Sequence, residues 1–140
     1  MASSSGEYRT SIDRAGWAIA VGALLCGAAS MLLVVRGGDA TFHAAAVALL
    51  LGSLFAALAI AAVGGPVWLA MHAIGWRGPA HAAAAGAIVG FVLVLAAHLS
   101  AGLDGDPLRL AQALGAALIA AALTGAIALV MWRIAYWRVG

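Results

Sequence analysis

The chain has 140 residues, of which 66% are hydrophobic and 9% are charged. Soluble domains average roughly 45–50% apolar and about 25% charged residues, so this chain lacks the polar surface that would cover a core in water. The composition therefore excludes a soluble globular domain and a disordered chain, and the single cysteine, Cys26, excludes a disulfide scaffold. We expect an integral membrane protein.

The charged residues leave four long uncharged stretches between them. A helix needs roughly 20 apolar residues to cross a hydrocarbon core of about 30 Å, and lipid-facing backbone favours helices because they satisfy their own hydrogen bonds. The alternating pattern of a membrane β-strand is absent. The sequence predicts an all-α membrane protein with a single membrane domain, residues 1–140, and four spans at about residues 16–35, 42–63, 80–101 and 108–132.

The first elements in chain order are an N-terminal tail, residues 1–14, and the first span. The tail is rich in serine and has no core of its own, so we expect it to be mobile. The apolar run from Trp17 to Val35 is longer than the roughly 7–15 residues of a signal-peptide core. We therefore expect an uncleaved first span.

The second uncharged stretch, residues 40–76, is too long for one crossing, because a straight helix of that length would reach about 55 Å. Gly64-Gly65-Pro66 supplies a break, since proline lacks an N–H and is tolerated in the first turn of a new helix. The sequence predicts a short interfacial helix at residues 66–76. Trp68, His72 and Trp76 share one face of it at four-residue spacing.

Four spans place both termini and the loop between the second and third spans on one side of the membrane. That side carries five of the seven arginines, and the positive-inside rule assigns it to the cytoplasm. Abundant alanine without lysine favours a GC-rich bacterial genome, so we expect a bacterial inner-membrane protein with both termini in the cytoplasm. The tryptophans near this face are the predicted interfacial anchors: Trp17, Trp68, Trp76, Trp132 and Trp137.

Small residues recur at four-residue spacing on each span, and such stripes let helix backbones approach closely in lipid. The predicted helix-packing residues are Gly22, Cys26, Gly52, Gly86, Gly90 and Gly125. The stripes fit packing within the chain and docking onto other integral membrane subunits, and these two uses can coexist.

Little in the chain points to chemistry. No charged residue lies deep in a span, which weighs against ion-coupled transport and proton pumping. No catalytic triad, carboxylate pair, phosphate loop or metal cluster occurs, so we expect no enzymatic activity. Two arginines beside the C-terminal span are too few for a phosphate track, so we expect no nucleic-acid binding.

Histidine is the remaining candidate ligand. His43 and His98 are predicted near the outer face, and His72 and His81 near the cytoplasmic face. Two pairs at opposite faces would suit a di-haem bundle, since haem iron accepts axial imidazole, and a bacteriochlorophyll magnesium could take a single histidine. His98 is the deepest of the four, so it is the first residue to test as a cofactor ligand.

The leading hypothesis is a small non-catalytic accessory or scaffold subunit that contacts membrane lipids and packs against larger membrane proteins. One alternative is a haem- or chlorophyll-binding component of an electron-transfer or light-harvesting complex that uses His98, with His43 as a second ligand. The other is a small oligomeric transporter, for which a polar pathway could draw on few residues: Ser30, Ser53, Ser100, Gln112 and Thr124.

Overall fold

A computed structural model describes residues 8–9, 11–38, 41–76, 78–102 and 107–138. The contacts divide the chain into two compact units. The first unit comprises Met1–Arg77 and Val130–Gly140, and the second comprises Gly78–Leu129.

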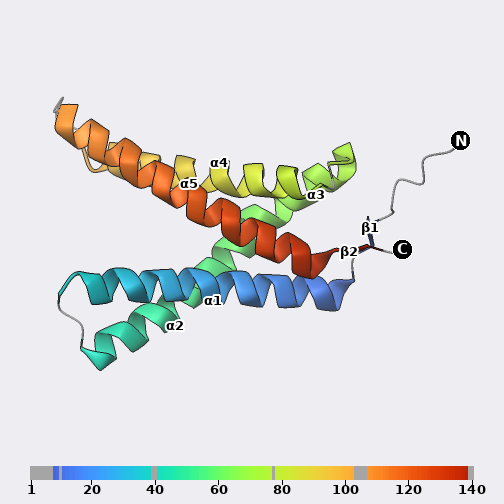
Figure 1. The fold of residues 1–140 in the computed structure, drawn as a ribbon, viewed down its shortest axis with the longest axis horizontal. Helices are drawn as coiled ribbons and strands as arrows, with labels where there is room; N and C mark the ends of the chain where they lie inside the picture. Colours follow the sequence, from blue (N-terminus) through green and yellow to red (C-terminus); the bar gives the residue numbers. More distant parts are fainter. Residues whose placement is uncertain (1–7, 10, 39–40, 77, 103–106, 139–140) are drawn as a thin grey trace, which may run out of the picture. The chain divides into compact units, whose positions relative to one another are not determined.

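The elements are helical except for two very short strands (Figure 1). In chain order they are β1 (Tyr8–Arg9), α1 (Ile12–Arg36), α2 (Phe42–Ala59), a π-helical turn η1 (Ile60–Gly64), α3 (Gly65–Ile74), α4 (Pro79–Ser100), α5 (Pro107–Ala135) and β2 (Trp137–Arg138). Helix α5 begins in the second unit and ends in the first.

Four helical runs in the described part of the chain are long and apolar enough to cross a membrane. They are Ile12–Arg36, Phe42–Ile74, Pro79–Ser100 and Pro107–Ala135. This result confirms the predicted all-helical class and the four apolar helices. It indicates a multi-pass membrane protein in contact with lipid.

The first helix starts earlier than the sequence pattern predicts. Ser11 is its N-cap, in an extended conformation, and its side chain accepts a 3.4 Å hydrogen bond from the Arg14 N–H. Part of the segment expected to be a mobile tail is therefore helical, and Tyr8–Arg9 pairs antiparallel with Trp137–Arg138. Residues 1–7 and 10 lie outside the described residues.

The second span corrects the expected break at Gly64-Gly65-Pro66. The helix continues from α2 through η1 into α3, so the structure does not show a separate interfacial helix (Figure 1). The Gly65 N–H bonds to the Ile60 carbonyl, which is the i to i+5 pattern of a π-turn. Because this turn shifts the hydrogen-bond register just before Pro66, the missing proline N–H does not end the helix.

Helix α3 ends at a glycine that needs its conformational freedom. Gly75 has φ +85°, a left-handed conformation that is unfavourable for other residues. Its N–H bonds to the His72 carbonyl, and the Trp76 N–H bonds to the Met71 carbonyl at 2.8 Å. The second span therefore stops here, 33 residues after it began at Phe42.

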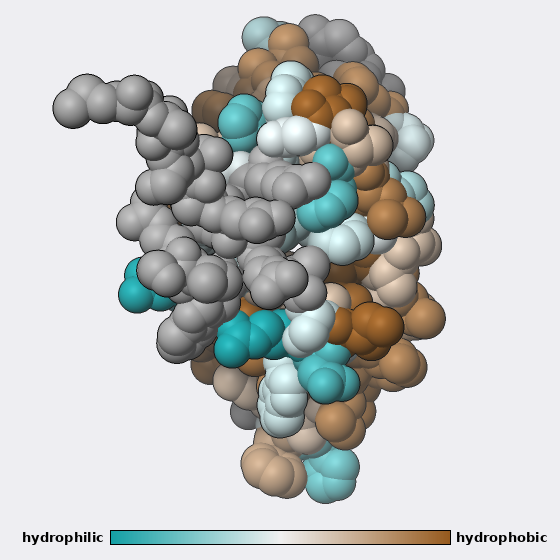
Figure 2. Space-filling model, turned by 90° about the vertical axis from the view of Figure 1, so that its right-hand side faces the viewer, coloured by the Kyte–Doolittle hydropathy of each residue, from teal (hydrophilic) through white to brown (hydrophobic). Residues whose placement is uncertain are grey.

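The size of the buried side chains is the inverse of that in a water-soluble protein, because small residues are buried and large apolar ones are exposed. Among the described residues no polar or charged one is buried, and the buried apolar ones are four alanines and a tyrosine: Ala18, Ala23, Ala113, Ala117 and Tyr136. Large apolar side chains are exposed on every long helix, including Leu33, Phe55, Ile88 and Leu118. Hydrophobic side chains cover much of the surface in Figure 2. Small residues inside and large ones outside are the pattern of helices that pack in lipid.

Candidate functional site

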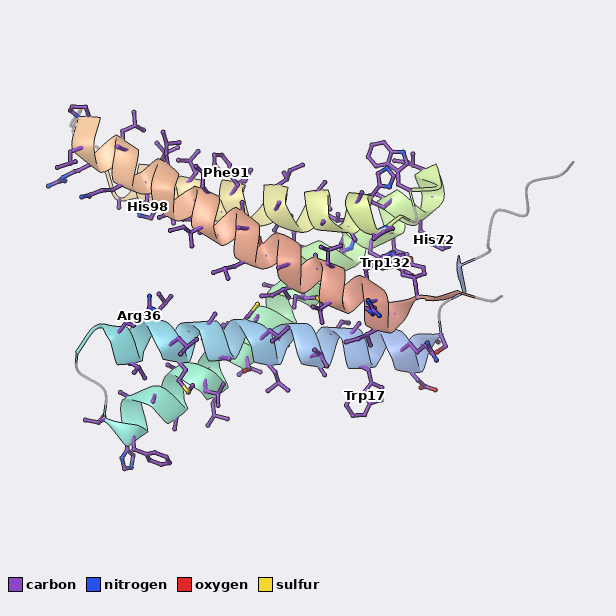
Figure 3. All side chains as sticks on the ribbon, viewed as in Figure 1. Trp17, Arg36, His72, Phe91, His98 and Trp132 are labelled. Atoms are coloured by element: carbon purple, nitrogen blue, oxygen red, sulfur yellow. The ribbon has the colours of Figure 1, made fainter. Side chains whose placement is uncertain are left out.

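An aromatic cluster joins α3 to the end of α5 within the first unit. Trp68 Nε1 donates a 2.8 Å hydrogen bond to Tyr136 Oη, although the two residues lie 68 positions apart. The Trp68 indole stacks on the His72 imidazole with ring centroids 5.3 Å apart, and the Trp132 indole stacks on the Tyr136 phenol at 5.7 Å. We call Trp68, His72, Trp132 and Tyr136 the aromatic cluster; Figure 3 labels His72 and Trp132.

Helical spacing builds each half of the aromatic cluster. Trp68 and His72 are four residues apart on α3, and Trp132 and Tyr136 are four apart at the end of α5, so each pair shares a face. Tyr136 is the centre of the cluster, because it is only 8% exposed and accepts the Trp68 hydrogen bond. Aromatic pairs of this kind contribute about 0.5–1.5 kcal/mol beyond the area they bury. The cluster therefore fixes the chain after α5 against α3.

One ring nitrogen of the aromatic cluster has no hydrogen-bond partner among the described residues. It is the buried His72 Nδ1. A tautomer with its hydrogen on Nε2 fits this environment, because an Nδ1–H would lack an acceptor. The arrangement brings together rings that pack and hydrogen-bond, with no carboxylate or thiol among the four members of the cluster.

The predicted cofactor ligands are both exposed, and they belong to different units. His98, on α4, has its Nδ1 2.9 Å from the Val94 carbonyl oxygen of its own helix, and this contact orients the imidazole. His43, at the start of α2, makes an edge-on contact with Phe42 at 6.2 Å between ring centroids. No group of three or more potential metal ligands occurs among the described residues.

Helices α1 and α2 approach closely at two of their glycines. A Cβ added at Gly27 would lie 2.6 Å from the Leu49 carbonyl oxygen and would also meet the Ser53 side chain. A Cβ added at Gly52 would lie 2.8 Å from Ser30 Oγ and 3.2 Å from Gly27 Cα. Gly52 was in the predicted packing set, whereas Gly27 was not. We call this contact the α1–α2 seam.

Helices α4 and α5 approach each other in the same way. A Cβ at Gly86 would lie 2.7 Å from the Thr124 carbonyl oxygen, and one at Gly90 would meet the Thr124 side chain. A Cβ at Gly125 would lie 3.2 Å from the Ala83 carbonyl oxygen. All three predicted glycines thus lie in one seam of the second unit, the α4–α5 seam.

The other two predicted packing residues lie on α1. A Cβ at Gly22 would meet the Met131 side chain, so this glycine faces the last turns of α5. Cys26 is partly buried, and its carbonyl oxygen accepts a 3.0 Å hydrogen bond from Ser30 Oγ. Gly22 and Gly27 thus serve two different neighbours of α1.

The predicted anchors fall into two groups. Trp17 and Trp76 are more than half exposed and lie outside the aromatic cluster, whereas Trp68, which is 37% exposed, and Trp132 belong to it. The Trp137 backbone is in β2, and its side chain lies outside the described part of the structure. Trp17 is 69% exposed on α1 and stands clear of the ribbon in Figure 3.

The hydroxyl groups on the spans bond mostly to their own helices. Ser30 Oγ donates to the Cys26 carbonyl, Ser100 Oγ to the Ala97 carbonyl, and Thr124 Oγ1 to the Ala120 carbonyl at 2.8 Å. Such i−4 and i−3 bonds satisfy the hydroxyl within one helix. Ser53 Oγ, at the α1–α2 seam, is buried without a partner among the described residues. Most of the described hydroxyl groups on the spans are therefore satisfied within their own helices.

Comparisons with protein-family models, with curated proteins and with solved structures find no match to this chain.

Proposed function

We propose that this protein is a small non-catalytic integral membrane subunit that packs beside larger membrane proteins, in a bacterial inner membrane with both termini in the cytoplasm. The observation that carries the proposal is where small, large apolar and hydroxyl side chains lie in the described structure. Small residues form the close helix contacts, and large apolar residues face outward. Hydroxyl groups bond back to their own helices. Among the described residues, the close helix contacts are therefore made mainly by small groups that serve packing.

Two helix glycines support docking onto another membrane protein. A Cβ built at Gly16 on α1 or at Gly115 on α5 would meet nothing within 4 Å. Glycine costs a helix roughly 0.5–1 kcal/mol relative to alanine, so a glycine that serves no contact within the chain calls for another use. A small position on a lipid-facing surface lets a helix of a second protein approach closely.

Purification in a mild detergent after membrane cross-linking tests the proposal, with copurifying proteins read by mass spectrometry. We expect a defined larger membrane protein with the native chain and its loss with Gly115→Leu, which fills the open position. Leu110→Phe is the matched control, because Leu110 is exposed on the same helix about 140° away around the axis. A free monomer from the native chain, or equal recovery of the partner with Gly115→Leu, would contradict the proposal.

A second candidate function is cofactor binding at His98. The hydrogen bond from the ring to Val94 orients the imidazole, and an oriented ring with a free Nε2 is what an axial haem or bacteriochlorophyll ligand requires. The same purified preparation decides this candidate by its absorbance. A Soret or Q band that His98→Leu abolishes would favour it over the accessory subunit, and a spectrum without such bands would remove it.

A further inference from the structure

The second span makes two contacts that each fix its rotation about its own axis. On α2, Gly52 faces α1, because a Cβ added there would lie 3.2 Å from Gly27 Cα. On α3, Trp68 Nε1 donates its hydrogen bond to Tyr136 Oη. Both contacts lie within the first unit, and the π-turn η1 lies between Gly52 and Trp68 in the sequence. The helix that runs through η1 must therefore satisfy both contacts at once.

A π-turn changes the direction in which the residues after it point. Gly52 and Trp68 are 16 residues apart, so in an uninterrupted α-helix, which turns about 100° per residue, they would point about 160° apart. The i to i+5 bond in η1 places one extra residue in a turn and so removes about 100° of rotation. Trp68 therefore points only about 60° from Gly52, on the side of the second span that faces α1.

The partner of Trp68 lies on that same side. A Cβ added at Gly22 of α1 would meet the Met131 side chain, so the last turns of α5 pack against α1. Tyr136 follows α5 directly. The rotation that η1 gives to α3 thus directs the Trp68 indole toward Tyr136 instead of away from α1.

Pro66 explains why the extra residue lies at η1. In a regular α-helix the proline ring would crowd the carbonyl group of Ala62, four residues earlier. The π-turn ends directly before α3, so Pro66 lies in the first turn of that helix, where a missing N–H is tolerated. The proline therefore favours a π-turn over a regular turn at this place in the span.

We propose that η1 is a conformational device that sets the rotation of α3, so that the α1–α2 seam and the aromatic cluster form together. Its π form presents Trp68 and His72 to the end of α5. Conversion to an α form would present Val67 and Met71 there instead, and the hydrogen bond from Trp68 would be lost. The device rests on packing within the first unit, and it does not rest on the proposed role as an accessory subunit.

Changes of length at η1 test the device in the full chain. One variant deletes Ala61, the other inserts an alanine after Ala62, and both carry Pro66→Ala, so they differ only in length. The deletion removes the extra residue, so the helix becomes regular with Trp68 still directed at Tyr136. The insertion turns Trp68 about 100° away. In a helix without a π-turn, both changes would turn Trp68 by the same amount, in opposite directions.

The readout is the indole N–H resonance of Trp68 in isotope-labelled protein in detergent micelles, assigned by its absence in Trp68→Phe. Adding Tyr136→Phe should shift this resonance in the native chain and in the deletion variant, and it should leave the insertion variant unchanged. An insertion variant that does not fold beside a folded, responsive deletion variant shows the same asymmetry and supports the proposal.

Two results would overturn the proposal. One is an equal response of the deletion and insertion variants to Tyr136→Phe, because the number of residues in η1 would then not set the direction of Trp68. The other is a deletion variant that does not fold or does not respond, because the deletion keeps Gly52 and Trp68 in their native directions.

Discussion

Replacing Gly27 with alanine lowers the free energy of unfolding by about 2 kcal/mol. The added Cβ would lie 2.6 Å from the Leu49 carbonyl oxygen, which belongs to the backbone of α2 and cannot rotate away. Helices α1 and α2 must therefore separate along the α1–α2 seam, and overpacking of this kind costs roughly 1–3 kcal/mol. Unfolding in mixed detergent micelles, followed by circular dichroism, measures the change.

Gly16→Ala is the matched control for that substitution. Gly16 lies on the same helix, and its added Cβ would meet nothing within 4 Å. Alanine is a better helix former than glycine, so we expect this variant to be unchanged or more stable by up to about 1 kcal/mol. Equal stability of Gly27→Ala and Gly16→Ala would mean that the two helices do not pack through Gly27.

Among substitutions in the aromatic cluster, Tyr136→Ala should lower the free energy of unfolding the most, by about 3 kcal/mol. Tyr136 is 8% exposed, stacks on Trp132 and accepts the Trp68 hydrogen bond, so its removal takes away all three contributions. Tyr136→Phe separates them, because it keeps the stacked ring and removes only the acceptor. We expect Tyr136→Phe to lower the free energy of unfolding by about 1 kcal/mol. This value is at the low end of the cost of leaving a hydrogen-bond donor, here Trp68 Nε1, without its acceptor.

The measurement for these variants is detergent-induced unfolding together with tryptophan fluorescence. Trp17→Phe serves as the control, because that exposed indole lies outside the cluster and its loss should leave stability unchanged. If Tyr136→Ala is no less stable than Trp17→Phe, Tyr136 does not fix the chain after α5 against α3.

The sequence predicted the helices well because membrane helices are governed by local composition. Uncharged stretches and flanking prolines located the starts of the helices at Phe42, Pro79 and Pro107 to within one residue. Pro66 was misinterpreted, because the same Gly-Gly-Pro triplet can end a helix or pass through a π-turn. Only the register of the surrounding hydrogen bonds decides between these outcomes.

Contacts between distant segments had no sequence signal. The Trp68–Tyr136 hydrogen bond joins residues 68 positions apart, and no local pattern relates them. The same holds for the pairing of β1 with β2. Gly27 was missed for a different reason. Gly22 and Gly27 point about 140° apart around α1, so a single four-residue stripe could not reveal two packing faces.

Four apolar helices that cross the membrane are the central claim, and site-directed labelling tests the first three crossings most directly. In a chain whose native cysteine is replaced by Cys26→Ala, single cysteines are introduced at exposed positions by Ile12→Cys, His43→Cys, Ile74→Cys and Ala101→Cys. Ile12 starts the first span, His43 and Ile74 lie at the two ends of the second, and Ala101 follows the end of the third. We predict that a membrane-impermeant maleimide labels Ile12→Cys and Ile74→Cys from one side of sealed vesicles, and His43→Cys and Ala101→Cys from the other. Labelling of His43→Cys and Ile74→Cys from the same side would show that the Phe42–Ile74 helix does not cross the membrane and would contradict the account.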